Sequence, residues 1–146
     1  RAKETVPTML NYKTFIEKKS LFNTPPAFGI YMIALVTDWI KEQGGLVEIE
    51  KVNEAKSSTL YECIDSSNFY NGTVEPADRS RMNVCFRLPS EELEKQFLAE
   101  SEKAGLVGLK GHRSVGGIRA SIYNAMPLEG VSRLIDFMGD FEKKNK

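Results

Sequence analysis

The chain has 146 residues, of which 41% are hydrophobic and 27% are charged, a length and composition typical of one globular domain with a real core. Its 20 basic and 20 acidic residues cancel, so we expect no general affinity for nucleic acid, which needs a basic face. No long uncharged apolar run is present, so we also expect no membrane span and no signal peptide.

The first 45 residues are dominated by one apolar helix, expected over residues 27–42. It is apolar on nearly every side, which is typical of a buried helix. Asn23 and Thr24 precede it, with Thr24 as the expected N-cap and Pro25 as the first helical residue. Such a cap needs no ligand, although free N–H groups at a helix start also attract phosphate. Residues 1–45 complete no unit of their own, so we expect this helix to pack against something outside the chain.

Residues 46–146 alternate helices with strands. Period-two alternation, with one polar face, is clear in two of the strands and indicates a sheet covered on one side only. The predicted class is α+β, with helices on one face of a largely antiparallel sheet. The expected elements, in chain order, are a helix over 47–66, strands over 69–74 and 81–88, a helix from the Ser90 cap to Gly105, strands over 106–109 and 118–123, and a helix over 127–143.

Two cysteines and one histidine limit the metal and redox chemistry of the chain. Cys63 and Cys85 form no CxxC motif, so we expect no zinc site and no other metal site. Both are expected to pack as small hydrophobes in a reducing compartment, and a disulfide between them stays open.

The stretch GHRSVGGIR, residues 111–119, holds the single histidine and two arginines between glycines. Arg119 lies opposite the apolar residues of its strand, and the planar fork of an arginine grips a carboxylate with two hydrogen bonds. His112 and Arg113 together suit a phosphate, and the glycine pair 116–117 is expected to let the backbone approach a ligand. These residues predict two anion sites for one small molecule with two anionic ends. On residue types alone, a solvated arginine, a structural histidine and a simple turn remain the alternative.

Three segments resemble the C-terminal part of the phosphoserine aminotransferases: FNTPPAFGIYMIALVTDWIKEQGG, VEPADRSRMNVCFRLPSEELEKQFL and GLKGHRSVGGIRASIYNAMPLEGVSRLIDFM. The similarity runs from about residue 7 to residue 141, and HRSVGGIRAS is its most specific block. The resemblance implies a class-V aminotransferase of fold type I, a homodimer that depends on pyridoxal phosphate. That family interconverts 3-phosphohydroxypyruvate plus glutamate with phosphoserine plus 2-oxoglutarate in serine biosynthesis, and some bacterial members also serve pyridoxine synthesis.

The resemblance also implies roles for five residues of this chain. Asn23 and Thr24 match residues that reach the cofactor phosphate of the neighbouring subunit. His112 and Arg113 match the grip on the substrate phosphate, and Arg119 matches the arginine that holds the substrate α-carboxylate. The three cationic side chains are then expected to converge on one shared cavity. No catalytic residue is expected here, because no lysine of the chain matches the context of the Schiff-base lysine that anchors the cofactor.

By this resemblance, residues 1–45 are the end of the large cofactor-binding domain and residues 46–146 are the whole small domain. The expected partners are the N-terminal part of the same enzyme, a homodimer mate, and the substrates phosphoserine and glutamate, with no nucleic acid and no membrane. The location is expected to be cytoplasmic, and the chain to be inactive without the N-terminal part. Two alternatives stay open: a stand-alone module that binds a phospho-amino acid, and an inert fragment.

Overall fold

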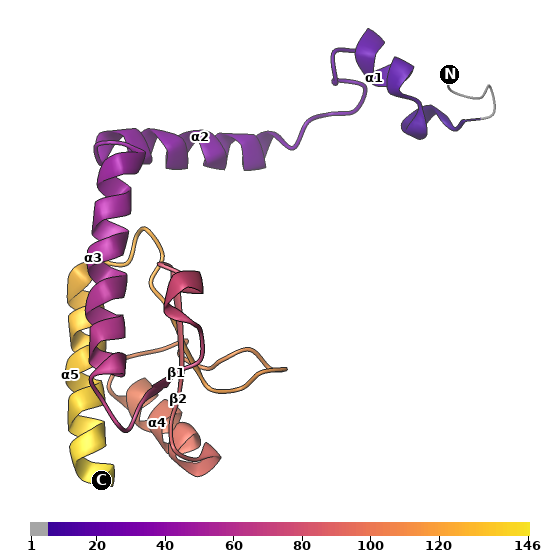
Figure 1. Cartoon of the computed structure of the whole chain (residues 1–146). Coiled ribbons are helices and arrows are strands. Elements are labelled where there is room, and N and C mark those ends of the chain that lie inside the picture. The colour runs from indigo at the N-terminus through magenta and orange to yellow at the C-terminus, as the bar shows by residue number, and fades with distance from the viewer. Residues whose placement is uncertain (1–5) are drawn as a thin grey trace. The chain divides into compact units, whose positions relative to one another are not determined.

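A computed structural model describes the chain from residue 6 to residue 146. The chain divides into two compact units between Gln43 and Gly44 (Figure 1). The first unit contains helices only, as far as the structure describes it. Its elements are the 3-10 helix η1 (Thr8–Leu10), the helix α1 (Tyr12–Glu17) and the helix α2 (Ala27–Glu42). The prediction of a helix over residues 27–42 is therefore confirmed.

The start of α2 differs from the expected start. Pro26 precedes the helix, and no side chain caps its first turn. A proline disfavours helical backbone in the residue before it, so Thr24 and Pro25 are both held out of the helix. The prediction of Thr24 as the N-cap and Pro25 as the first helical residue is wrong. Asn23 and Thr24 instead lie on an exposed segment without helical structure.

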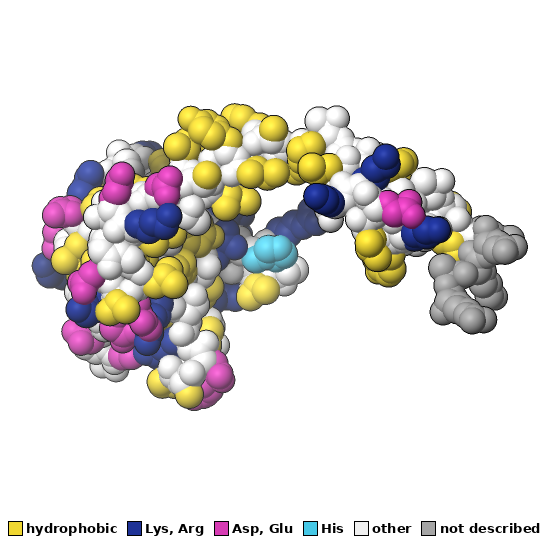
Figure 2. Space-filling model, turned by 90° about the horizontal axis from the view of Figure 1, so that it is seen from above, with side chains coloured by type: hydrophobic (Ala, Val, Ile, Leu, Met, Phe, Trp, Pro, Cys, Tyr) yellow, Lys and Arg dark blue, Asp and Glu magenta, His cyan; other side chains and the backbone are white. Residues whose placement is uncertain are grey.

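No residue of α2 is buried within this chain, in contrast to the burial that its apolar sequence predicts. Large apolar side chains stand exposed along the helix, and Figure 2 shows them in yellow. They are Phe28, Ile30, Tyr31, Met32, Ile33, Leu35 and Val36. Exposed apolar surface of this kind is typical of sites where a protein contacts another polypeptide, a ligand or a membrane.

The second unit is built on a three-stranded antiparallel sheet in the order β1-β2-β3. Buried and half-buried residues alternate along its two longer strands, as the period-two pattern predicts. The strands are β1 (Asn71–Gly72), β2 (Asn83–Arg87) and β3 (Ile118–Ser121).

Three helices and the connecting segments complete the core on the buried face of this sheet. They are α3 (Leu46–Asp65), α4 (Glu91–Lys103) and α5 (Leu128–Asn145). Figure 1 shows α3 and α5 side by side. Ser90 caps α4 as predicted, because its Oγ accepts a hydrogen bond from the Leu93 N–H at 3.3 Å. The expected class, α+β with helices on one face of an antiparallel sheet, is confirmed.

The strand expected over residues 69–74 is reduced to the two residues of β1. Phe69 and Tyr70 are buried in the core instead, and their N–H groups donate to Ser67 Oγ at 2.9 and 3.2 Å. Because this local turn binds the backbone N–H groups that would otherwise pair with a neighbouring strand, β1 begins only after Tyr70.

The strand expected over residues 106–109 does not form. Gly105 and Gly108 have φ angles of +81° and +78°, which interrupt an extended backbone. An isolated bridge between Lys110, the residue after this segment, and Ile118 pairs the chain with β3.

Phe97 of α4 stands at the centre of the core. Its side chain is fully buried and makes edge contacts with Tyr70, Phe86, Phe137 and Phe141, with ring centroids 5.1 to 6.2 Å apart. Each aromatic pair in this geometry stabilises a fold by about 0.5–1.5 kcal/mol beyond the burial of its area. One ring therefore joins α4 and α5 to the sheet.

Replacing this ring tests where the stability of the chain lies. Phe97→Ala is expected to lower the free energy of unfolding by about 3–5 kcal/mol, because it leaves a cavity at the centre of the core. Phe28→Ala is the matched control, since that side chain on α2 is 77% exposed, and a change within about 0.5 kcal/mol is expected. Urea unfolding of the two variants checks this, and equal losses would contradict it.

A bidentate ion pair fastens the end of α3 to the loop before β2. Arg79 Nη1 and Nη2 donate to Asp65 Oδ2 and Oδ1 at 2.6 and 2.8 Å, and the guanidinium lies 4.5 Å from the ring centroid of Tyr61. The hydrogen bonds from Arg79 lower the pKa of Asp65. An aspartate with a lowered folded-state pKa stabilises the fold above its unfolded pKa of about 4 and loses this contribution as the pH falls through the folded value.

Asp65→Asn is therefore expected to remove part of the loss of stability that acid causes in the parent chain. Unfolding free energies measured in urea at neutral pH and near pH 3 check this. The control is Asp140→Asn, which breaks an exposed pair with Lys143 that contributes little. If Asp65→Asn lost as much unfolding free energy between neutral pH and about pH 3 as the parent chain does, the pair would not contribute to the pH dependence of stability.

Candidate functional site

The HRSVGG segment forms a closed loop that leads into β3. Its base is closed by a hydrogen bond from the Gly111 N–H to Gly117 O at 2.9 Å. Within it, the N–H groups of Val115 and Gly116 both donate to His112 O, at 2.9 and 2.8 Å. These three bonds hold the residues of the loop in a fixed turn, which Figure 1 shows in orange as an excursion from the sheet.

The glycines of this loop are required by neighbouring protein atoms. A Cβ added at Gly111 would lie 2.0 Å from Gly116 O, and one added at Gly117 would lie 2.6 Å from Arg87 Cδ. Gly116 and Gly117 also have φ angles of +77° and +71°, where glycine is favoured. The glycines thus let the loop close on itself and on Arg87, while the expected approach of the backbone to a ligand stays a prediction.

His112 and Arg113 are both exposed on this loop, where the histidine is the cyan side chain of Figure 2. His112 Nδ1 lies 2.7 Å from Ser114 Oγ and accepts a hydrogen bond from the Ser114 N–H at 3.3 Å. Because Nδ1 accepts, the neutral ring carries its proton on Nε2. An N–H donor and a permanently charged guanidinium therefore stand side by side, and together they suit a phosphate dianion.

Arg119 lies on the half-exposed face of β3, opposite Cys85 of β2. Its backbone N–H donates to Leu109 O at 2.8 Å, which fixes the strand beside the preceding segment. The Nε atom of Arg119 is buried and has no hydrogen-bond partner within residues 6–146. A buried N–H without a partner costs free energy, so this group calls for an acceptor that the described residues do not supply. A carboxylate is the acceptor that a guanidinium binds best.

In the part of the chain that the structure describes, the loop cations and Arg119 lie in different places. His112 and Arg113 line a cavity of about 250 Å³ together with Arg87, whereas Arg119 is not part of its lining. The sheet connects the two places instead. Arg87 stands two residues along β2 from Cys85, the cross-strand neighbour of Arg119, so both arginines lie on the half-exposed face as diagonal neighbours. Within the described residues there are thus two cationic places, one on the loop and one on the half-exposed face of β3, and their convergence on one cavity stays a prediction.

Asn23 and Thr24 belong to the other compact unit. Both side chains are exposed, and Asn23 Nδ2 lies 3.7 Å from Met9 Sδ, a weak contact. Their amide and hydroxyl donors are therefore accessible to an anion such as a phosphate.

Two structural groups near the site were missed by sequence reasoning. One is the ion pair of Arg87 with Glu94, whose members are separated by a turn and belong to different elements, so the sequence carries no periodic signal for it. The other is Lys56, a buried lysine on α3. It falls four residues before Leu60 on the apolar stripe of its helix, and a charged residue at such a position is a signal that could have revealed it.

Lys56 fixes the chain directly after β3. Its Nζ donates to the carbonyl oxygens of Ile122, Tyr123 and Met126 at 3.2, 2.9 and 3.0 Å. Burial lowers the pKa of this lysine, and the three carbonyl acceptors satisfy its three donors. The end of the strand that carries Arg119 is thus tied to α3.

Cys63 and Cys85 are both half-buried free thiols. Across residues 6–146, no three histidine, cysteine, aspartate or glutamate side chains gather where they could hold a metal ion. None of the helices that the structure describes has the length and apolar character needed to cross a membrane.

Comparison with known proteins places this fold and these residues in a family. The profile of the class-V aminotransferases matches residues 3–134. This chain belongs to the class-V aminotransferase family. The resemblance noted in its sequence is confirmed by its relatives, since the phosphoserine aminotransferase of Syntrophobacter fumaroxidans is 58% identical over 99% of this chain and 40% of its own length. That of Lysinibacillus sphaericus is 54% identical over 100% of this chain and 41% of its own length.

Solved structures agree with the family assignment. The phosphoserine aminotransferase from Bacillus circulans subsp. alkalophilus superposes with a TM-score of 0.90 at 52% identity, covering 100% of this chain and 41% of that one. The pyridoxal-phosphate-bound enzyme from Trichomonas vaginalis gives a TM-score of 0.82 at 36% identity, covering 95% and 40%. This class-V aminotransferase chain therefore has their fold and spans about two fifths of the length of the relatives that it matches.

The closed loop can be tested through Gly111. Gly111→Ala is expected to force the loop open, because the new Cβ would clash with Gly116 O, and to cost about 1–3 kcal/mol of stability. Hydrogen exchange of the Val115 and Gly116 amides should become faster than in the parent. The control is Gly139→Ala in α5, where no atom lies within 4 Å of the added Cβ. That change should stabilise the helix by about 0.5–1 kcal/mol, and slower exchange in Gly111→Ala would contradict the assignment.

Proposed function

We propose that this chain is part of a phosphoserine aminotransferase, which interconverts 3-phosphohydroxypyruvate plus glutamate with phosphoserine plus 2-oxoglutarate. Its role is to supply the cations that bind the substrate. The cationic residues of the loop and of β3 are the observation that carries the proposal, and the buried Nε of Arg119, which has no hydrogen-bond partner within residues 6–146, supports it. The names and sequences of the relatives support the choice of reaction.

The two cationic places correspond to the two anionic ends of phosphoserine. Arg119 binds the α-carboxylate with two hydrogen bonds and so fixes the orientation of the Cα–H bond, which transamination requires. His112 and Arg113 bind the phosphate, the group that serine lacks. Distinguishing phosphoserine from serine thus depends on the loop, while holding an amino acid in the reactive orientation depends on the strand.

Pyridoxal phosphate is the cofactor of this proposal. It is bound in the Trichomonas vaginalis enzyme, and a solved phosphoserine aminotransferase 54% identical to this chain contains a Schiff base. When bound, the cofactor supplies an electron sink for transfer of the amino group. In this chain the accessible donors of Asn23 and Thr24 fit its phosphate, held across a subunit interface. Lys56 does not fit the anchoring lysine, because its three donors are used by backbone carbonyls.

The partners follow from the length and surface of the chain. The relatives are about two and a half times longer, since the chain covers 40–41% of them. We infer that the remaining part of such a polypeptide covers the exposed apolar side chains of α2, with residues 1–45 as the end of the large domain and residues 46–146 as the small domain. The complete enzyme is then a cytoplasmic homodimer, and the two free thiols agree with a reducing compartment.

The proposal is tested in the full-length enzyme that contains this segment. Arg119→Lys is expected to lower kcat/KM for phosphoserine by about 100-fold, because a lysine cannot form the two parallel hydrogen bonds that orient the carboxylate. Arg113→Met is expected to raise KM for phosphoserine and to reduce the preference for phosphoserine over serine. Steady-state kinetics with both amino acids check these effects.

Arg133→Met, an arginine on α5 outside both cationic places, is the control and should behave as the parent. Unchanged kinetics in Arg119→Lys would overturn the proposal. Calorimetry of the isolated chain with phosphoserine separates the alternatives. Tight binding without cofactor, weakened by Arg119→Lys, would favour a stand-alone binding module instead.

A further inference from the structure

We propose that Arg87, held by Glu94, is a positioning residue for the loop that presents His112 and Arg113. The anchoring is a property of this chain, while its consequence for substrate binding rests on the function proposed above. Arg87 is not expected to touch the substrate. It acts by fixing the direction in which the loop leaves the sheet.

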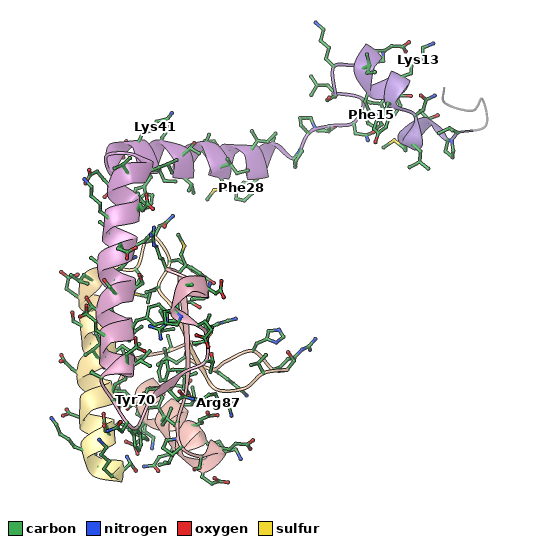
Figure 3. All side chains as sticks on the ribbon, viewed as in Figure 1. Lys13, Phe15, Phe28, Lys41, Tyr70 and Arg87 are labelled. Atoms are coloured by element: carbon green, nitrogen blue, oxygen red, sulfur yellow. The ribbon has the colours of Figure 1, made fainter. Side chains whose placement is uncertain are left out.

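The guanidinium of Arg87 links three elements of the second unit. Arg87 is the last residue of β2 and is labelled in Figure 3. Its Nε donates to Glu94 Oε1 of α4 at 2.5 Å, and its Nη1 donates to Val115 O of the loop at 3.2 Å. The planar fork of an arginine fixes the angle between these two bonds, so the loop is held at a set direction to the start of α4.

Glu94 is itself held rigidly. Its side chain is only 9% exposed, and its Oε1 also accepts the Leu88 N–H at 3.3 Å. It stands on the first turn of α4, one turn before the buried ring of Phe97. A position on a helix that is fixed by the core gives the carboxylate little freedom. The loop is therefore connected to the core through two side chains, Arg87 of β2 and Glu94 of α4.

The stem of Arg87 supports the base of the loop. A Cβ on Gly117 would lie 2.6 Å from Arg87 Cδ, and the Nη1 atom lies 3.7 Å from where a Cβ on Gly116 would be. At both positions, a residue larger than glycine would place its Cβ against the side chain of Arg87. Its stem contacts the base of the loop and its fork binds the carbonyl of Val115, so the loop is fixed at two points.

The charges around the cavity indicate a positioning role for Arg87. Glu94 neutralises Arg87, so the pair adds no net charge beside His112 and Arg113. The other charged residues that line the cavity are Glu91, Lys95 and Lys110. Residues of the loop and its neighbours thus attract the anion, and the Arg87–Glu94 pair holds the loop in position.

The test removes the pair without leaving a buried charge. Arg87→Met combined with Glu94→Gln keeps the stem of residue 87 and an acceptor for the Leu88 N–H, whereas Arg87→Met alone would strand a buried carboxylate. In the 146-residue chain, hydrogen exchange of the Val115 and Gly116 amides is expected to become about tenfold faster in the double variant. The control is Arg133→Met, which removes another arginine bonded to a loop carbonyl, that of Ala104 at 3.4 Å.

Kinetics in the full-length enzyme measure the consequence. The double variant is expected to raise KM for phosphoserine about tenfold to a hundredfold, as a misplaced binding group does, with kcat within about twofold of the parent. In an Arg113→Met background the same double change should add less than about twofold, because the loop it positions has already lost its cation. A residue with a merely structural role would not show this non-additivity.

Two outcomes would overturn the inference. One is a parental exchange rate of the loop amides in the double variant. The other is a parental KM in the double variant when Arg113→Met alone has raised KM. A parental KM in Arg113→Met itself would overturn the proposed function, so the two failures are distinguishable.

Discussion

A three-stranded sheet with helices on one side buries only one of its faces, and the rest of this chain is arranged around that constraint. The alternation along β2 and β3 places Val84, Phe86, Ile118 and Ala120 under the helices. The residues between them lie on the other face, because successive side chains of a strand point to opposite sides of the sheet. The core and Arg119 thus lie on opposite faces of the same strands, and the packing that holds the sheet also holds this arginine.

This arrangement explains how a chain with no net charge concentrates cations. Arg119 is held in a strand, while His112 and Arg113 are held on a loop closed by three backbone hydrogen bonds. Glu94 compensates Arg87, the arginine between these two places, and leaves the others free to act on an anion. The positive potential at these residues therefore depends on where the backbone places the cations and not on the net charge of the chain.

Two features of the chain are incomplete in physically different ways. The Nε of Arg119 is a buried donor without an acceptor within residues 6–146, and α2 is an apolar helix without a covering layer. Under the proposed function, the substrate carboxylate accepts a hydrogen bond from the first, and the remaining part of the enzyme covers the second. Both agree with a segment that spans two fifths of the length of its aminotransferase relatives.

Local signals in the sequence predict the helix over 27–42, the Ser90 cap, and the alternation that turns Arg119 away from the core. These signals do not predict that β1 is short, which follows from the competition of Ser67 for backbone N–H groups. Nor do they predict that the prolines after Thr24 keep it out of α2. The fit of the loop glycines around Arg87, and the ion pair of this arginine with Glu94, arise when separate elements pack together. Those contacts join residues from separate elements, and periodicity along one strand or helix carries no information about which side chain a neighbouring element will place against it.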